Sequence, residues 1–254
     1  MNVTIDQRFR GFEGIAHGGY LGGLLAGELA SAEATLRRPV PVDRGLRIDP
    51  REDGTRELLD RDELLVRVGP VHLDLRVPSP VSPEESESAA ARSVARSPGL
   101  HHRFPGCFGC GDGRADGDAL RLFTGPVDGR ELVAAPWTPH PSLADAAGDV
   151  RSEFIWAALD CPTIWAAVFA SPQGSEERVV THRLAVARSA PVRAGVPHVV
   201  VGWLLAREPR AVLAGGAIFS AQGRPLALAR HTLALAAWGV PLGLDRWRQG
   251  TPSR

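Results

Sequence analysis

Apolar and polar residues follow two different periods along this chain, which predicts a mixture of helices and strands. Residues 17–33 contain the run HGGYLGGLLA, in which glycines fall on one face of a helical wheel, while Tyr20 and the leucines fall on the other. A face built of glycine lets another part of the chain approach the backbone closely. We therefore expect a central helix at about 17–33 that packs against a second element.

A second helical pattern covers about residues 151–169, read from the stretch SEFIWAALDCPTIWAAVFA. Placing Gly148 on Gly14 aligns the large apolar residues of the two helices without gaps, which suggests a duplicated unit. Pro162 cannot donate a backbone hydrogen bond, so we expect a kink or break at this point of the second helix.

Extended segments with alternating apolar residues follow each helix. After the first helix these are VDRGLRID, ELLVRVG and VHLDLRV. After the second they are RVVTHRLAVARS, HVVVGWLLARE, AVLAGGAIFSA and PLALARHTLALAA. A largely buried helix followed by several strands requires a sheet that curls around it, so each half is predicted to have this plan.

The two halves are joined by a region of different character. Residues 82–99 predict an exposed helix, with Ser82 as its N-cap, Pro83 at its first position and Gly99 at its end. The stretch HHRFPGCFGCGDGRADGD reads as a loop, and ALRLFTG and GRELVAAPW then read as strands. We place the boundary here, with one unit at residues 1–100 and the second at 101–254.

Charge and composition narrow the classes of function. The chain has 254 residues with 29 basic and 29 acidic side chains, so it lacks the basic excess of a nucleic-acid-binding surface. No apolar run approaches the roughly 20 residues that span a bilayer, and the first residues do not resemble a signal peptide. Three cysteines are an odd number for a disulfide framework. We expect a cytoplasmic protein with neither nucleic-acid nor membrane partners.

Several motifs resemble a known family. The HGG that opens the first helix, followed by antiparallel strands, resembles hotdog-fold thioesterases, particularly the phenylacetic-acid-pathway type of acyl-CoA thioesterase. CFGCG followed by DALRLF resembles the segment where many such domains begin, and EFIWAALDCPTIWA resembles the second helix of tandem ("double") hotdog proteins. The resemblance covers nearly the whole chain. It implies an α+β fold of two hotdog units, each a sheet wrapped around a central helix, packed as an intrachain pseudo-dimer.

The resemblance also implies an active-site arrangement. In the family, a carboxylate on the central helix attacks the thioester or activates water, and a backbone N–H at the start of the partner unit's helix polarises the carbonyl. The position of that acid falls on Ala26 in the first helix and on Asp160 in the second. The second helix carries Arg151, Ser152 and Glu153 where the first has HGG. Each unit therefore lacks what the other retains.

Helix geometry allows one complete site to be shared between the units. A helix rises about 1.5 Å per residue, so the acid and the amide of one helix are too far apart to act on one carbonyl. Two antiparallel helices would bring the start of the first, at Gly18 or Gly19, to the middle of the second, at Asp160. We predict Asp160 as base or nucleophile, the Gly18 or Gly19 N–H as oxyanion donor, and His17 in support.

Each of these residues also has a plain structural interpretation. Asp160 could be a carboxylate bonded to a backbone group of the other unit, the glycines could serve packing alone, and His17 could cap its helix. Tyr20 and Trp156 are predicted to line the acyl pocket, with a place in the core as the alternative.

Cys107 and Cys110 form a Cys-x-x-Cys pair that raises the question of a metal site. His101 and His102 would complete four zinc ligands, but adjacent histidines point different ways in an extended chain and no second cysteine pair follows. We interpret the pair as a tight buried turn, and Cys161 as a small hydrophobic residue. No metal and no organic cofactor is expected.

These patterns favour hydrolysis of a small-molecule acyl thioester, with acyl-CoA as the substrate. A first alternative is an acyl-CoA or acyl-carrier binding protein without activity, because the HGG motif and the acid each occur once. A second is an enoyl-CoA hydratase or dehydratase, although the signature Asp-x-Asn-Pro-x-x-His is absent around His17. Exposed sheet edges would allow double units to form a homo-oligomer.

Overall fold

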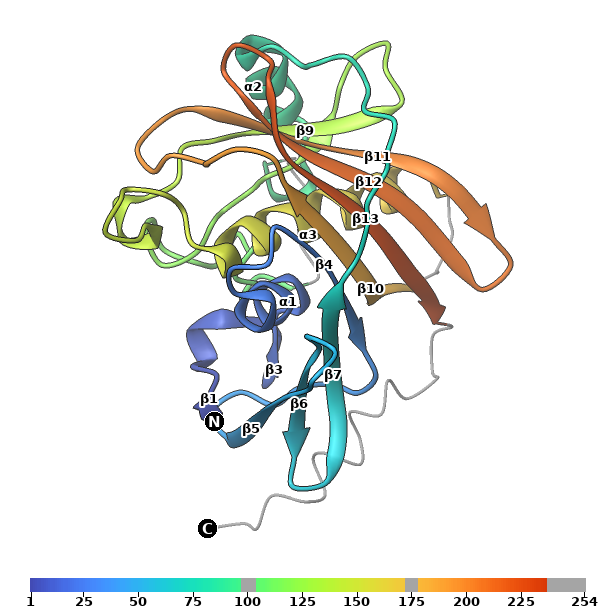
Figure 1. Ribbon diagram of the computed structural model, residues 1–254. Helices are drawn as coiled ribbons and strands as arrows, with labels where there is room; N and C mark the ends of the chain where they lie inside the picture. Colours follow the sequence, from blue (N-terminus) through green and yellow to red (C-terminus); the bar gives the residue numbers. More distant parts are fainter. Residues whose placement is uncertain (97–103, 172–177, 237–254) are drawn as a thin grey trace.

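The computed structural model describes residues 1–96, 104–171 and 178–236, and its main feature is one antiparallel sheet of eleven strands (Figure 1). The strands of this sheet are β1 (Asn2–Thr4), β4 (Ser31–Leu36), β5 (Gly45–Pro50), β6 (Arg56–Asp60), β7 (Glu63–Pro70), β8 (Gly125–Pro126), β9 (Leu132–Trp137), β10 (Arg178–Arg188), β11 (His198–Glu208), β12 (Ala211–Ser220) and β13 (Pro225–Ala236). A small separate pair, β2 (Arg10–Phe12) and β3 (Ile15–Ala16), precedes the first helix. The α-helices are α1 (Gly18–Ala26), α2 (Pro83–Ala91) and α3 (Ser152–Phe169).

The two halves of the sheet have the same strand order when each is followed from the outer edge toward the centre. The full order runs β1-β5-β6-β7-β4-β10-β13-β12-β11-β9-β8, so the four strands that follow α1 are mirrored by the four that follow α3. The two sets meet where β4 pairs with β10, with Ala34 opposite Leu184. The β4–β10 pairing joins the strands of the first and second halves of the chain into one continuous sheet.

Helices α1 and α3 lie in the curve of this sheet and form the main core with it (Figure 1). Successive residues of a strand face opposite sides of a sheet, and β9 shows the result. Ala135 belongs to the core around α3, whereas Ala134 belongs to a second cluster in which it packs with Ala89 of α2. Helix α2 therefore covers the outer face.

Helix α1 is shorter than the sequence suggested. It ends at Ala26 and not near residue 33, because Gly27 adopts a φ of 56° and the chain then enters β4 at Ser31. A positive φ is accessible to glycine at little cost, so Gly27 stops the helix. The predicted helix included the first residues of β4, so the predicted end near residue 33 was wrong.

Helix α3 spans Ser152–Phe169, close to the expected range, and Pro162 does not break it. The Thr163 hydroxyl bonds to the same turn, with Oγ1 2.6 Å from the Asp160 carbonyl oxygen and 3.2 Å from that of Leu159. Gly202 on β11 lies against this turn, where an added Cβ atom would overlap the Pro162 carbonyl oxygen. The expected break is absent because the helix is supported by the sheet beneath it.

Strand predictions were correct for the second half and less so for the first. β5, β7 and β9 to β13 lie within or close to the expected segments, whereas β1 to β4 and β6 were not predicted. VHLDLRV, residues 71–77, crosses toward α2 without entering a ladder, and ALRLFTG enters the sheet only at Gly125. In the latter segment Arg121 has a φ of 51°, which a regular strand cannot contain.

Helix α2 begins as predicted. Ser82 accepts a hydrogen bond from the Glu85 amide, Glu85 bonds back to the Ser82 amide, and Pro83 occupies the first turn. The helix ends at Ala91, and Gly99, His101 and His102 lie outside the described residues. Among the described residues, no helix is long and apolar enough to cross a membrane.

Candidate active site

The glycine face of α1 packs directly on α3, and the two helices run antiparallel at this contact. A Cβ atom added at Gly19 would lie 2.6 Å from the Trp156 carbonyl oxygen, and one added at Gly23 would lie 2.5 Å from Glu153 Cα. Both distances are shorter than any side chain tolerates. Glycine at these positions thus permits backbone-to-backbone contact, which explains a helix composed so heavily of a poor helix former.

This contact brings the Asp160 carboxylate to the first turn of α1. The Gly19 amide donates a hydrogen bond of 2.7 Å to Asp160 Oδ2, and His17 Nδ1 lies 3.4 Å from the same oxygen. Asp160 is only 2% exposed and His17 only 3%. The two groups predicted to meet therefore meet, and the free N–H groups and dipole of the helix N-terminus face a buried carboxylate.

The second carboxylate oxygen faces residues that the sequence did not single out. Thr181 Oγ1 on β10 donates to Asp160 Oδ1 at 3.2 Å, and His231 Nδ1 on β13 lies 3.7 Å from that oxygen. Thr181 stands where the β10–β13 register shifts, between Thr181 and Arg183. Bulges of this kind re-aim side chains beside active sites. A hydroxyl and an imidazole thus converge on Oδ1.

His17 caps α1 and contacts Asp160 with the same ring nitrogen. Its Nδ1 accepts a 3.3 Å hydrogen bond from the Tyr20 amide, which confirms the capping interpretation. Burial alone would lower the pKa of His17, but the negative charge of Asp160 and then the contact with Cys107 raise this pKa above its ordinary value. At His17 the charge of Asp160 and the Cys107 contact together outweigh the effect of burial.

The other ring nitrogen of His17 faces three buried cysteines. Nε2 lies 3.4 Å from Cys161 Sγ, Cys161 Sγ lies 3.9 Å from Cys107 Sγ, and Cys110 Sγ lies 3.8 Å from Cys107 Sγ. Thiols of Cys110 and Cys161 directed at Cys107 lower the pKa of Cys107 well below its usual range, and His17 adds to this effect. The same arrangement raises the pKa of Cys110 and of Cys161. The Cys-x-x-Cys segment is the predicted buried turn, closed by a 2.9 Å bond from the Gly111 amide to the Cys107 carbonyl.

His231 is fully buried and remains neutral at neutral pH. Burial lowers the pKa of His231 to about 4, although the nearby charge of Asp160 acts in the opposite direction. Its Nδ1 lies 2.6 Å from Thr163 Oγ1, whose hydroxyl can donate to the Asp160 carbonyl oxygen while it accepts from the ring. This chain of contacts holds His231 beside Oδ1 without adding a positive charge.

The burial of His231 predicts a loss of stability in mild acid. The unfolded chain takes up a proton near pH 6.5, whereas the folded chain does so only near pH 4, so stability falls as the pH falls between these values. The expected loss is about 3 kcal/mol. Urea denaturation of the wild type and of His231→Asn from pH 7 to pH 4 should show a flatter pH dependence for the variant. Parallel curves would contradict this account.

The amide N–H of Gly18 is free to bind a ligand, whereas that of Gly19 is not. Within the described part of the chain, the Gly18 N–H meets no hydrogen-bond acceptor, whereas the Gly19 N–H is used by Asp160. Gly18 is half-buried, and a Cβ atom added there would lie 3.2 to 3.3 Å from side-chain atoms of Leu36 and Thr181. Of the two predicted oxyanion donors, Gly18 is the one able to donate to a ligand.

Tyr20 and Trp156, which the sequence predicts to line an acyl pocket, both lie in the hydrophobic core. The Tyr20 ring stacks on Phe9 with centroids 4.2 Å apart, and burial raises the pKa of Tyr20 to about 12. Trp156 is 0% exposed, and its ring fills the space left by Gly22. Both rings fill the core beside the helix contact, and their part in an acyl pocket stays a prediction.

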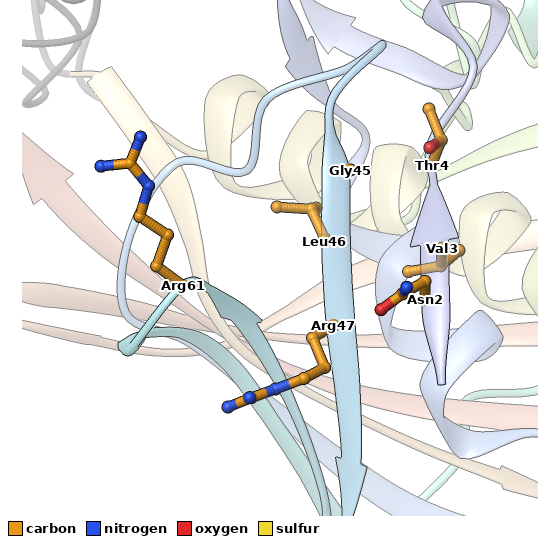
Figure 2. Close-up of a pocket in the computed structure, with 7 residues that line it drawn as sticks. All are labelled: Asn2, Val3, Thr4, Gly45, Leu46, Arg47 and Arg61. Atoms are coloured by element: carbon orange, nitrogen blue, oxygen red, sulfur yellow. The ribbon is translucent and has the colours of Figure 1, made fainter.

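Two surface pockets lie away from this cluster. Figure 2 shows the first, of about 380 Å³, at β1 and β5 with Arg47 and Arg61 as its charged groups. The second, of about 530 Å³, is lined by residues that include Phe123, Trp137 and His140. Neither pocket includes His17, Asp160 or Thr181, and the first offers no acid or base for catalysis.

No protein-family model and no curated protein matches the sequence. Solved structures do match over nearly the whole chain. A protein of Novosphingobium aromaticivorans assigned as a thioesterase has a TM-score of 0.59 and 10% identity, covering 93% of this chain and 95% of its own. The tesB protein of Mycobacterium avium subsp. paratuberculosis has a TM-score of 0.57 and 12% identity, covering 88% of this chain and 89% of its own.

A conserved protein of unknown function with a hotdog fold, from Alicyclobacillus acidocaldarius, has a TM-score of 0.56 and 12% identity, covering 93% of this chain and 92% of its own. At such low identity these matches establish the fold alone. The chain has the hotdog fold that its motifs resemble.

Proposed function

We propose that this hotdog-fold protein hydrolyses acyl thioesters, with acyl-CoA as the substrate class, at the junction of α1 and α3. The observation that carries the proposal is the 2.7 Å hydrogen bond from the Gly19 amide to Asp160 Oδ2. It places a fixed carboxylate beside the free amide of Gly18. A base and an oxyanion donor side by side are the minimum that acyl transfer to water requires.

In this mechanism Asp160 acts as the general base. Gly19 and His17 hold Oδ2, and Oδ1 takes a proton from a water molecule as that water attacks the thioester carbon. The carbonyl oxygen becomes an oxyanion that accepts a hydrogen bond from the Gly18 amide. Collapse of the intermediate breaks the C–S bond, the proton passes to the leaving thiolate, and the products are a carboxylic acid and a free thiol. Direct attack by Oδ1 is the covalent variant of the same geometry.

We also propose that residues 1–100 and 101–254 form two hotdog units packed as a pseudo-dimer. The alignment of the two helices makes Glu153 the counterpart of Gly19, and Ala157 the counterpart of Gly23. An added Cβ atom at Gly19 would lie 3.0 Å from Ala157 Cα, and one at Gly23 would lie 2.5 Å from Glu153 Cα. A two-fold interface requires this reciprocity, and the mirrored strand order supports the same relation.

The pseudo-symmetry leaves the second, related site without chemistry. The counterpart of Asp160 is Ala26, and the first turn of α3 presents Ser152 and Glu153 in place of the glycines. Alanine offers neither a base nor a nucleophile. The proposal therefore assigns one active site to each chain.

Substrate must reach Oδ1 from the side of Gly18 and Thr181. Asp160 and His17 are buried, but Gly18 and Thr181 are half-exposed and lie against each other. The small residue at Gly18 leaves the backbone accessible to a thin acyl thioester. Exclusion of water on all other sides strengthens each electrostatic contact with the reacting carbonyl.

A protein that binds acyl-CoA without hydrolysing it is the second candidate function. It is favoured by the burial of Asp160 and by its hydrogen bond to Gly19, which also suit a carboxylate that only joins two helices. The two functions differ in what happens to the thioester. A binder would leave the thioester intact at any enzyme concentration, whereas a hydrolase would release a free thiol.

The proposal is tested by thiol release from a panel of acyl-CoA substrates of different chain length and ring content. We expect turnover of at least one member, and a 10- to 100-fold lower kcat/KM for Thr181→Val, because a hydrogen bond to a carboxylate contributes about 1.5–3 kcal/mol. Thr232→Val, at a half-buried position of β13, is the matched control and should keep wild-type rates. An inactive wild type, or equal rates for the two variants, would contradict the assignment.

A further inference from the structure

The cluster of His17, Cys107, Cys110 and Cys161 is not used by the proposed hydrolysis. Its members come from three distant parts of the chain: the cap of α1, the loop before β8, and the middle of α3. All three cysteines are buried, and Trp165 packs against them. Each of the four side chains carries an atom, a thiol sulfur or an imidazole nitrogen, that can bind a metal ion.

Three of the six pairwise distances in the cluster match those between the ligands of a tetrahedral zinc ion. With Zn–S near 2.3 Å and Zn–N near 2.0 Å, tetrahedral angles place sulfurs about 3.8 Å apart and sulfur and nitrogen about 3.5 Å apart. The observed Sγ–Sγ distances are 3.8 and 3.9 Å, and His17 Nε2 lies 3.4 Å from Cys161 Sγ. The ligand atoms of His17, Cys107 and Cys161 all lie within 4.8 Å of one another, and Cys110 Sγ joins this group through its 3.8 Å contact with Cys107 Sγ.

The chain around the cluster is shaped to keep the four ligands together. A Cβ atom added at Gly109, between the paired cysteines, would overlap Cys161 Sγ and lie 2.9 Å from His17 Nε2. The loop is held by the buried Arg114, which donates to the carbonyl oxygens of Gly106 and Arg8 at 2.9 Å each. A fixed loop with a Cys-x-x-Cys turn is the usual source of two zinc ligands.

We propose that His17, Cys107, Cys110 and Cys161 bind one zinc ion. Three thiolates and one imidazole are ligands that favour zinc, and four protein ligands leave no open position for substrate. The site would therefore be structural and would join the α1 cap, the loop and α3. Ligation through Nε2 would place the proton of His17 on Nδ1, which would then donate to Asp160 Oδ2 at 3.4 Å in place of accepting from the Tyr20 amide.

Such a site differs from the metal site considered from the sequence. That site needed His101 and His102, which lie outside the described residues, whereas the cluster recruits His17 and Cys161 from far along the chain. The zinc site does not depend on the proposed hydrolysis. Metal content can be measured whether or not the protein turns over a thioester, so the two proposals can fail separately.

The test is the zinc content of the full chain purified under reducing conditions, followed by cobalt titration of the metal-free protein. We expect about one zinc per chain, and one equivalent of Co²⁺ with the absorption of a tetrahedral thiolate site. Wild-type protein with no bound zinc and no such cobalt spectrum would overturn the proposal.

Variants connect the metal to the named residues. Cys110→Ser should bind zinc at least tenfold more weakly than the wild type, because one thiolate is lost at the least constrained ligand. His140→Asn, at an exposed histidine outside the cluster, should keep full zinc content. Equal metal affinity in Cys110→Ser and the wild type would remove Cys110 from the site.

A disulfide within the cluster is the competing outcome. After denaturation in chelator without reductant, a zinc protein should show three reactive thiols, whereas a disulfide would leave one. The wild type should give three. A count of one in freshly purified protein would show that the cluster pairs by oxidation and would overturn the zinc assignment.

Discussion

Replacing Gly23 by alanine is expected to lower the free energy of unfolding by about 3 kcal/mol, a large effect for one methyl group. The added Cβ atom would lie 2.5 Å from Glu153 Cα, 2.6 Å from the Ser152 carbonyl oxygen and 2.8 Å from the Glu153 amide nitrogen. All three are backbone atoms, so relief requires the two helices to separate. The gain of about 1 kcal/mol in helix propensity cannot offset this strain.

Urea denaturation monitored by circular dichroism measures the effect, with Gly45→Ala as the matched control. Gly45 lies on β5 with no heavy atom within 4 Å of an added Cβ atom, so this variant should stay within about 0.5 kcal/mol of the wild type. Equal stability of the two variants would show that α1 and α3 do not pack this closely.

The sequence predicted the helix contact because its physical cause is local. Four glycines at helical spacing lower the intrinsic stability of a helix, so their presence indicates that another element packs closely against it. The acid occurs only on the second helix, at Asp160, and the glycine-rich start only on the first. A shared site therefore required the two helices to pack antiparallel. The bond between Gly19 and Asp160 confirms the predicted meeting of these two segments.

Other features depend on contacts that no local pattern encodes. Thr181 and His231 reach Asp160 only because β10 and β13 pair with each other and β10 carries a register shift beside Thr181. The cysteine cluster likewise depends on the fold, since Cys161 is 54 residues from Cys107. In the sequence, His101 and His102 are the histidines next to the Cys-x-x-Cys pair, whereas His17 lies far from it and meets it only through the fold.

Strand β4 shows why the end of α1 was misplaced. Residues 31–36 read SAEATL, which contains good helix formers, and their strand conformation comes from pairing with β7 and β10 on either side. Tertiary pairing overrides propensity at such positions. The turn at Gly27 was the local signal for the helix end.

Replacing Asp160 by asparagine is expected to lower kcat/KM for acyl-CoA hydrolysis by about 10³-fold, within the usual range for removal of a general base. Asparagine has nearly the same size, and its amide oxygen can still accept the hydrogen bond from Gly19. It cannot take a proton from water or attack a carbonyl. The variant therefore removes the chemistry while it preserves the contact between the helices.

The most direct measurement is the rate of thiol release by wild type and Asp160→Asn on the best acyl-CoA substrate, with Asp49→Asn as the control on the surface of β5. The account predicts wild-type rates for Asp49→Asn, and a loss of about 10³-fold for Asp160→Asn, with both variants folded by circular dichroism. Equal rates for wild type and Asp160→Asn would contradict the account, because the carboxylate between the two helices would then have no part in the reaction.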